Sequence, residues 1–554
     1  MRQRRSDSGH GGDDAVAAAS DPGSADAAML APDGGGGRTA GRTGGRSGGR
    51  RGNPRRGAEA GLSQQPWRQP ENPDPPVAPL DEDGVQAIHR GALHILQEIG
   101  IEFLNDEALA LFRAAGCRVD GQRVRMDGDF VTEMVARAPG PFTITPRNPD
   151  RAVTIGGQAM TFIHVCSPPN VWDLAQGKRP GDRAAFRDLT MLAQAFNCIH
   201  LSGGYPVEPV DLHPATRHLD CLHDQLTLTD KGVHAYCLGR ERVEDVMEMV
   251  RIAAGLTHAE FDASPRMFTN INSTSPLKHD FPMIDGALRM ARRGQPVVVT
   301  PFTLAGAMAP VTMAGAVTLS VAETLAAVAL LQYAAPGCPV GMGTFTSNVD
   351  MRSGAPAFGT PEYMRATQMT GQMARFYGLP LRSSGVCTAN APDGQAMWET
   401  SNSLWAAVQS GTNMVYHAAG WLEGGLIASP EKLVMDCEML QMIQRYFEPA
   451  LTATTAQDIA LSAVAEVGAG GHYFGCEHTR ERYETAFYAP IVSDWRNYEA
   501  WEADGAVQTP ERAHRLYRQI VDGFQPPAMD PAIAEELADF VDRRKAEGGA
   551  PTDF

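Results

Sequence analysis

The chain lacks the sequence signatures of several large protein classes. It has no run of 18 apolar residues, so we expect no membrane-spanning helix. It has no P-loop, no dinucleotide-binding glycine fingerprint and no His-Glu-x-x-His, which argues against nucleotide binding and zinc-protease chemistry. Its basic start is not followed by an apolar core, so we expect no secretory signal peptide.

Cysteine is sparse and shows no pairing pattern. Nine cysteines are spread over 554 residues, which is an odd number, and no Cys-x-x-Cys occurs. Reduced thiols fit this distribution better than a disulfide framework does, and reduced thiols are typical of the cytosol. The sequence therefore predicts a cytoplasmic protein.

Basic residues are fewer than acidic ones, 48 against 65. The formal net charge is -17, and an acidic surface of that size argues against nucleic acid or an anionic membrane as the main partner. Hydrophobic residues make up 43% and charged residues 20%, which is the usual balance of a soluble globular enzyme. We therefore expect a small-molecule substrate or another protein as the partner.

Composition divides the chain into four regions. Residues 1–78 are rich in Gly, Arg, Ala and Pro and cannot bury enough apolar surface to offset the entropy of ordering, so they are predicted to form a disordered tail. Residues 79–158 show three helical patterns and two short strand patterns, which predict an α+β cap. Residues 159–450 form the central region, and residues 451–554 show helical patterns only, which predicts a C-terminal helical extension.

The central region alternates short apolar runs, rich in Val, Ile and Thr, with longer helical stretches. About eight such pairs occur in fewer than 300 residues, which is typical of a closed parallel (β/α)₈ TIM barrel. In such barrels the site lies at the carboxyl ends of the strands. The predicted strands are 160–165, 199–205, 233–238, 267–272, 297–302, 340–345, 381–386 and 413–417.

Polar and aromatic residues recur at the carboxyl ends of these strands, where they would face one pocket. Some of them have an alternative role, because Asp and Asn after a strand often cap the next helix, and this alternative stays open for Asp393. The candidate site residues are His164, Tyr205, Asn272, Phe345, Asp393, Gln395, His417, Trp421 and Glu423.

The segment after the eighth strand is the strongest single candidate. His417 is followed by small residues, then by Trp421, Glu423 and a pair of glycines, which is a poor composition for a core. A lone histidine is more often a satisfied core residue than a catalyst. An aromatic face attracts a quaternary ammonium with about 2 kcal/mol when desolvated, and a nearby carboxylate adds Coulomb attraction. The segment thus favours a cation site.

A zinc site is the competing interpretation. His164 and Cys166 near the first strand, with Cys237 after the third, would supply three ligands. Spacing alone is weak evidence, because single cysteines are usually buried as small apolar groups. We therefore expect no bound metal and keep a zinc-dependent enzyme as an alternative.

Several long phrases of the sequence resemble the trimethylamine methyltransferase (MttB) superfamily. The likeness runs from about Asp81 to the end of the chain, in order and without large gaps. The segments that carry it are 301–315, 350–354, 377–383, 419–426, 478–479, 487–488 and 493–499.

The resemblance implies a TIM-barrel enzyme that moves a methyl group from a methylated amine to the Co(I) corrinoid of a partner protein. Founding members carry pyrrolysine in the barrel, whereas this chain has only standard residues, and Ala389, Asn390 and Ala391 stand where many relatives have Asp-Ser-Lys. It therefore resembles the non-pyrrolysine members, which act on glycine betaine or other quaternary amines. As with many barrels, we expect a homo-oligomer.

The departure of a quaternary nitrogen as a neutral amine needs no proton, so the protein has only to hold the cation, orient it and exclude water. Within that picture each candidate residue receives a role. Trp421, Tyr205 and Phe345 form the aromatic surround, Glu423 or Asp393 balances charge, and His417 and Asn272 orient a substrate carboxylate, with His164 and Gln395 nearby. Two alternatives remain open: a zinc-dependent methyltransferase that uses His164, Cys166 and Cys237, and a non-catalytic betaine-binding barrel, because the loop after the seventh strand departs from its relatives.

Overall fold

A ring of parallel strands lies at the centre of the structure, a computed structural model that describes residue 62 and residues 64–552. Seven strands are hydrogen-bonded in the order β6-β18-β17-β14-β12-β10-β9, and every pair within this sheet is parallel. Their bounds are β6 Thr161–Phe162, β9 His234–Ala235, β10 Phe268–Ile271, β12 Val297–Val299, β14 Val340–Gly343, β17 Leu381–Ser384 and β18 Met414–Tyr416.

A single residue, Leu201, closes the ring. It forms parallel bridges to Ile163 beside β6 and to Gly232 before β9, and the flanking Ser202 N–H donates to the Gly232 carbonyl at 2.8 Å. The predicted strand 199–205 is thus reduced to one bridging residue, and the chain turns soon after it at Gly204, where φ is 93°. Eight parallel positions in closed order make the fold a (β/α)₈ barrel, as the sequence predicted.

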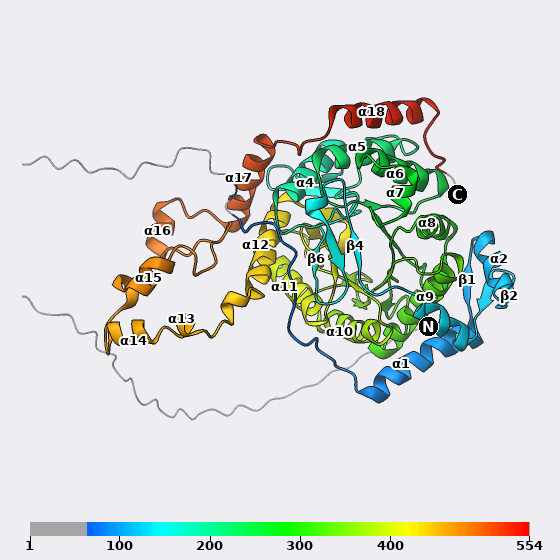
Figure 1. Cartoon of the computed structure of the whole chain (residues 1–554), viewed down its shortest axis with the longest axis horizontal. Coiled ribbons are helices and arrows are strands. Elements are labelled where there is room, and N and C mark those ends of the chain that lie inside the picture. The colour runs from blue at the N-terminus through cyan, green and yellow to red at the C-terminus, as the bar shows by residue number, and fades with distance from the viewer. Residues whose placement is uncertain (1–61, 63, 553–554) are drawn as a thin grey trace, which may run out of the picture. The chain divides into compact units, whose positions relative to one another are not determined.

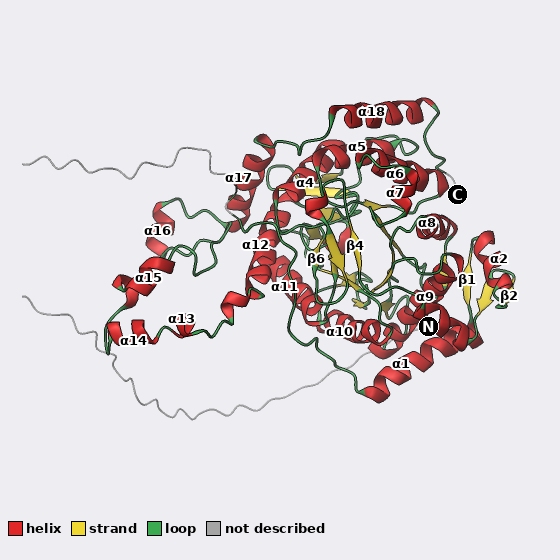
Figure 2. Cartoon of the chain, viewed as in Figure 1, coloured by secondary structure: helices red, strands yellow, loops and turns green. Residues whose placement is uncertain are grey.

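One helix follows each strand position and covers the outside of the ring (Figures 1 and 2). Most of these helices begin at a polar side chain that accepts a backbone N–H, such as Asp182, Asp280, Thr312, Thr360, Asp393 or Ser429. In chain order they are α4 Arg183–Ala195, α5 Arg217–Leu228, α6 Arg240–Ala253, α8 Phe281–Arg292, α9 Met313–Ala334, α10 Pro361–Phe376, α11 Gly394–Gln409 and α12 Pro430–Tyr446.

Helix α9 is long and apolar enough by composition to pass for a membrane span, alone among the described helices. Its most apolar window is 83% buried, because α1 and α3 of the N-terminal region pack on one side and α8 and α10 on the other. Glu323 lies within it, fully buried, and accepts hydrogen bonds from Ser273 and Ser275 in the loop after β10. The helix is therefore part of the barrel wall.

The N-terminal region packs against α9 and the lower end of the barrel. The β4–β5 hairpin closes the end where the strands begin, because Phe142, Ile144 and Ile155 cluster with the barrel residues Phe268 and Met414. The elements are α1 Glu82–His94, a π-helix at Ile95–Ile99, β1 Ile101–Phe103, α2 Asp106–Ala114, β2 Arg118–Asp120, β3 Arg123–Arg125, α3 Gly128–Ala136, β4 Phe142–Ile144 and β5 Val153–Ile155.

Residues 64–80 run in extended form along the barrel. The Asn72 amide donates to the Val408 carbonyl at 2.9 Å, and the Val77 N–H donates to the Gln409 carbonyl at 2.8 Å. The structure thus packs this part of the chain, whereas the sequence predicts a tail up to residue 78. The rest of the predicted tail, residues 1–61 and 63, lies outside the described residues.

Helices dominate the region after the barrel, as predicted. Helix α17 packs on α12 and α4, and α18 packs on α5 and α6, where Arg544 forms an ion pair with Asp245 at 2.6 Å. The elements are a 3₁₀ turn at Pro449–Leu451, α13 Ala456–Ile459, α14 Leu461–Val467, a 3₁₀ turn at Tyr473–Gly475, α15 Glu477–Arg482, α16 Tyr498–Ala503, α17 Thr509–Asp522 and α18 Pro531–Ala546.

Two small sheets and short segments build the rim at the carboxyl end of the strands. One sheet has the order β19-β20-β7-β8, the other β13-β15-β16, while β11 pairs with β1 of the N-terminal region. The bounds are β7 Asn170–Asp173, β8 Gly177–Pro180, β11 Lys278–His279, β13 Leu304–Ala305, β15 Ser347–Val349, β16 Pro356–Ala357, β19 Trp421–Leu422 and β20 Ile427–Ala428. The short helix α7 His258–Asp262 lies in the connection between α6 and β10.

Candidate active site

A cavity of about 320 Å³ lies at the carboxyl ends of the barrel strands. Seven of the eight strand positions contribute to its wall, directly or through the loop that follows. This is the place where TIM barrels carry their chemistry. The lining residues with polar or aromatic side chains are Cys166, Ser167, His234, Tyr236, Cys237, Asn270, Asn272, Phe302, Phe345, Arg382, Tyr416, His417 and Trp421.

An aromatic wall forms one side of the cavity. The ring of Phe345 lies 6.1 Å from that of Trp421 and 5.1 Å from that of Phe302. The Trp421 indole is fixed because its N–H donates to the Cys387 carbonyl at 3.2 Å. Rings held in this way present their electron-rich faces without further ordering cost, which suits a quaternary ammonium.

His417 stands where the chain leaves β18 and turns. Its φ is 50°, and Gly420 three residues later has a φ of 95°, so the chain folds back tightly over Ala418 and Ala419. The Gly420 N–H donates to the Asp436 carboxylate on α12 at 2.8 Å, which holds this turn. As a result the His417 ring lies 4.1 Å from the Trp421 ring, centroid to centroid.

The contacts of His417 define its protonation. Its Nε2 lies 3.3 Å from the Arg382 guanidinium, which can only donate, so Nε2 accepts and the ring proton sits on Nδ1, 3.5 Å from the Cys166 sulfur. Burial and the neighbouring Arg382 charge hold the pKa of His417 well below 6.5. The ring is therefore neutral at physiological pH and works by hydrogen bonding and packing.

Arg382 is the most unusual residue of the cavity. It lies on β17, is only 3% exposed, and donates to the Ser384 hydroxyl at 2.8 Å and to His417. Its guanidinium lies over the Tyr416 ring at 4.4 Å and the Phe345 ring at 5.4 Å, and its Nε has no hydrogen-bond partner. Burial lowers its pKa.

No carboxylate among the described residues forms an ion pair with Arg382. A buried cation without a counter-ion is costly, and a planar guanidinium is the side chain best shaped to hold a carboxylate with two hydrogen bonds. The cavity thus has an aromatic wall suited to a cation beside a free positive charge suited to an anion. Sequence analysis did not single out Arg382, although a charged residue inside an apolar strand was a usable signal.

The structure brings four of the nine candidate residues into this cavity, namely Asn272, Phe345, His417 and Trp421. Asn272 is held by its amide, which donates to the Thr300 carbonyl at 2.9 Å. Tyr205 lies one layer back, with its ring 4.8 Å from that of the lining residue Tyr236. His164 is fully buried behind Ser202, its Nε2 3.1 Å from the Ser202 hydroxyl, and burial lowers its pKa to about 4.

The structure places the remaining three candidates outside the cavity wall. Asp393 caps α11 by accepting the Ala396 N–H at 3.1 Å, the alternative that the sequence left open. Gln395 donates to Glu399 one turn further along the same helix, and Glu423 forms an ion pair with Lys178 at the rim. Local partners thus occupy these polar groups, and none of them supplies a carboxylate to the cavity.

The proposed zinc ligands do not share a site. His164 bonds to Ser202, Cys166 contacts His417, and the Cys237 sulfur lies 3.1 Å from the Thr269 hydroxyl. Burial raises the pKa of both thiols to about 12, which disfavours the thiolate that zinc requires. Among the described residues, no group of three His, Cys, Asp or Glu side chains is placed to hold a metal ion.

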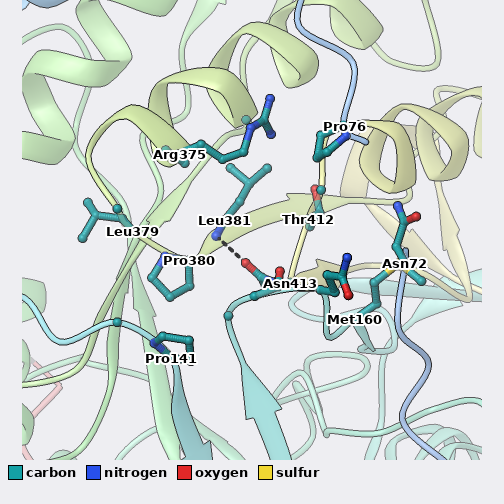
Figure 3. A pocket seen from close by; sticks show the side chains of 18 of the residues that line it. Asn72, Pro76, Pro141, Met160, Arg375, Leu379, Pro380, Leu381, Thr412 and Asn413 are labelled. Atoms are coloured by element: carbon teal, nitrogen blue, oxygen red, sulfur yellow. Dashed lines mark hydrogen bonds between the residues drawn. The ribbon is translucent and has the colours of Figure 1, made fainter. Parts of the chain in front are cut away.

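A larger cavity, of about 530 Å³, lies at the opposite end of the barrel, where β17 and β18 begin (Figure 3). Its wall is mostly proline, glycine and aliphatic side chains, and Asn413 there accepts the Leu381 N–H at 3.0 Å. Arg375, its one arginine, donates to the Ser410 carbonyl at 2.6 Å. These polar groups serve the backbone, so we assign the chemistry to the smaller cavity.

The chain has relatives among known proteins. The family model described as trimethylamine methyltransferase (MTTB) matches residues 46–549. A glycine betaine methyltransferase of Desulfitobacterium hafniense (strain Y51) is 36% identical over 472 residues, covering 85% of this chain and 98% of that protein. The trimethylamine methyltransferase MttB of Desulfitobacterium hafniense (strain DSM 10664 / DCB-2) is 26% identical over 477 residues, covering 85% and 95%. The solved monomethylamine methyltransferase MtmB of Methanosarcina barkeri has a TM-score of 0.48 at 11% identity, over 83% of this chain and 88% of that one.

Proposed function

The chain belongs to the trimethylamine methyltransferase (MTTB) family and is a methyltransferase, and on this premise we propose that its methyl donor is a betaine, a quaternary amine with its own carboxylate. The acceptor would be the Co(I) corrinoid of a partner protein. The observation that carries the proposal is the buried, unpaired Arg382 beside the aromatic wall of the same cavity. Trimethylamine has no carboxylate and would leave this charge without a partner.

The two ends of a betaine match the two halves of the cavity. The ammonium methyl groups would pack against Trp421 and Phe345, while the carboxylate would accept two hydrogen bonds from Arg382. His417 holds the guanidinium through its Nε2, and Asn272 lines the same wall. The similarity to a glycine betaine methyltransferase supports this class of donor.

The reaction does not require the protein to transfer a proton. When the C–N bond breaks, its electron pair stays on nitrogen and the product is a neutral tertiary amine, so no acid is required. A neutral His417 and two thiols whose pKa is raised to about 12 agree with a site that binds and orients without exchanging protons. The reduced corrinoid, when its carrier protein is docked, supplies the nucleophile.

The rim of the barrel offers a surface for that carrier. Apolar side chains stand exposed on all eight segments that follow the strand positions, with Val311 73%, Met351 72% and Trp398 60% exposed. Exposed apolar side chains around a cavity mouth mark an interaction surface. The full set, called the rim residues below, is Leu174, Val210, Leu238, Phe281, Val311, Met351, Trp398 and Leu426.

The test is methyl transfer from a panel of donors to free cob(I)alamin, followed by its change in absorbance and by mass spectrometry of the amine product. We expect glycine betaine or a larger betaine to be demethylated and trimethylamine to be inert. Turnover of trimethylamine at the rate of the betaines would overturn the role of Arg382. Betaine binding without transfer, to free cobalamin or to a corrinoid protein, would instead favour a non-catalytic betaine-binding barrel.

Two further proposals concern location and assembly. All nine cysteines are free thiols, and eight of them are buried, which agrees with a reducing compartment, so we propose that the enzyme works in the cytoplasm. We also propose that it is a homo-oligomer.

A further inference from the structure

One polar group in the wall of the smaller cavity has no partner in the protein. Tyr416, the last residue of β18, lines this cavity and is only 1% exposed, and its hydroxyl makes no hydrogen bond to any described residue. Burial raises the pKa of Tyr416 well above 10, so the phenol keeps its proton. The hydroxyl is therefore a buried donor without an acceptor, an arrangement that costs stability unless a ligand completes it.

The other two buried tyrosines of the described chain have partners. The Tyr363 hydroxyl donates to the Ser384 carbonyl at 2.7 Å, and the Tyr517 hydroxyl donates to the Asp188 carboxylate at 2.6 Å. Neither of these tyrosines lines the cavity. Buried phenols that serve packing are thus satisfied by the protein, whereas the one in the cavity wall is left for something that enters the cavity.

The Tyr416 hydroxyl stands close to the unpaired cation of the same cavity. The Arg382 guanidinium carbon lies 4.4 Å from the centre of the Tyr416 ring. A phenol oxygen is about 3 Å from its ring centre, so the hydroxyl lies within about 7 Å of that carbon, a gap that one carboxylate spans with hydrogen bonds of about 2.8 Å to each group. The two groups can therefore hold the same anion.

We propose that the Tyr416 hydroxyl donates a hydrogen bond to the carboxylate of the methyl donor, beside the two that Arg382 donates. The inference rests on the proposed betaine donor and assigns a second residue to its anionic end. The two oxygens of a carboxylate accept about four hydrogen bonds, so a bidentate guanidinium leaves room for the phenol. Because the ring of Tyr416 also lies against the guanidinium, one side chain orients the cation and contacts its anion.

This contact makes Tyr416 a determinant of specificity. The aromatic wall of Trp421 and Phe345 attracts any methylated ammonium, so it does not distinguish one quaternary amine from another. A donor without a carboxylate leaves both the guanidinium and the phenol unpaired in a buried wall, and such a site rejects it strongly. The choice among donors therefore lies at the carboxylate end of the cavity.

The test is Tyr416→Phe, which removes the hydroxyl and keeps the ring that lies against Arg382. Calorimetric titration with three probes separates the two ends of the cavity. Glycine betaine has both charged groups, tert-butylacetate keeps the carboxylate but replaces the ammonium with a neutral carbon, and tetramethylammonium has no carboxylate. We expect the variant to bind the two carboxylates roughly 20-fold more weakly and to bind tetramethylammonium as the wild type does.

The matched control is Tyr517→Phe, which removes a buried hydroxyl on the outside of the barrel. This variant should bind all three probes like the wild type, but it should melt at a lower temperature because Asp188 loses a donor. Tyr416→Phe, without ligand, should melt no lower than the wild type, since it removes a polar group that nothing in the described protein satisfies. The two substitutions should thus have opposite effects on affinity and stability.

Rates with free cob(I)alamin give a third readout. In Tyr416→Phe the KM for glycine betaine should rise with the dissociation constant, while kcat stays within about threefold, because the hydroxyl contacts the carboxylate and not the reacting methyl group. Unchanged affinity for both carboxylates, an equal loss for tetramethylammonium, or a lower melting temperature of Tyr416→Phe would overturn the inference and leave the betaine donor standing. A wild type that binds neither carboxylate would overturn the proposed donor, and this inference with it.

Discussion

The two ends of the barrel differ in what their cavities contain. The lower cavity is the larger, about 530 Å³ against 320 Å³, yet its polar groups are spent on backbone atoms. The upper cavity contains a buried arginine without a counter-ion, a neutral histidine and a wall of aromatic rings. A charged group without a protein partner, more than volume, distinguishes a binding site from a gap in packing. In a TIM barrel the upper end carries activity and the lower end stability.

The sharpest test of that difference compares two arginines. Arg382→Ala should lower kcat/KM for a betaine roughly 100-fold, about 3 kcal/mol, because the substrate carboxylate loses its cation. Arg375→Ala in the lower cavity should leave kcat/KM within about twofold, since Arg375 binds only backbone carbonyls in the structure. Steady-state rates with free cob(I)alamin measure both. Equal losses in the two variants would erase the distinction between the ends.

Sequence patterns predicted the barrel well because the alternation of strand and helix repeats eight times. They missed the reduction of the second strand to Leu201, since Gly204, at which the chain turns, leaves the apolar pattern before it intact. They also missed Arg382. In the sequence it is only a charged residue within an apolar strand, and the structure is needed to show that no carboxylate among the described residues pairs with it.

Some candidate site residues were predicted from their position after a strand but do not line the cavity. Three of the candidates follow strands just as His417 does, yet each is engaged elsewhere. Asp393 caps α11, Gln395 donates to Glu399 on the same helix, and Glu423 forms an ion pair with Lys178. A sequence shows which residues follow a strand, whereas the side-chain direction there depends on contacts with distant segments, such as Lys178.

The aromatic wall provides the next largest effect. Trp421→Ala should lower kcat/KM for a betaine about 30-fold, the equivalent of about 2 kcal/mol, because the ammonium loses its best aromatic face. Trp421→Phe keeps a ring and should recover most of the activity. A loss in both variants that tracks a lower melting temperature would show that Trp421 serves packing and not binding.

The rim residues should affect only transfer to the protein partner. Val311→Ser with Met351→Ser removes two exposed apolar side chains and should lower methyl transfer to a corrinoid protein roughly 10-fold, about 1.4 kcal/mol. Transfer to free cob(I)alamin should not change, because the cavity is intact. If the two acceptors lost activity equally, the rim would act through the cavity and not through docking.

Replacing Asn413 at the lower end should reduce stability and leave activity unchanged. Its amide donates to the carbonyls of Gly157 and Ala159, both at 3.0 Å, and its oxygen accepts the Leu381 N–H. Asn413→Ala should lower the free energy of unfolding by about 2 kcal/mol and leave kcat/KM of the folded enzyme within about twofold. Chemical denaturation and steady-state rates separate the two quantities. A large loss of activity at unchanged stability would move chemistry to the lower end.

The smallest expected effect is that of pH. In the upper cavity, burial and Arg382 hold the pKa of His417 well below 6.5, burial lowers the pKa of His234 to about 3, and burial raises that of Cys166 to about 12. Arg382 stays cationic throughout. Between pH 6 and 8 no group of the cavity changes charge, so kcat/KM with free cob(I)alamin should be flat. Only in more acidic solution should the rate fall, because a protonated His417 can no longer accept from Arg382 and would repel it. An inflection near pH 6.5 that disappears in His417→Gln would show that the histidine titrates in the working range, and the neutral, proton-free site argued for the upper end would then be wrong.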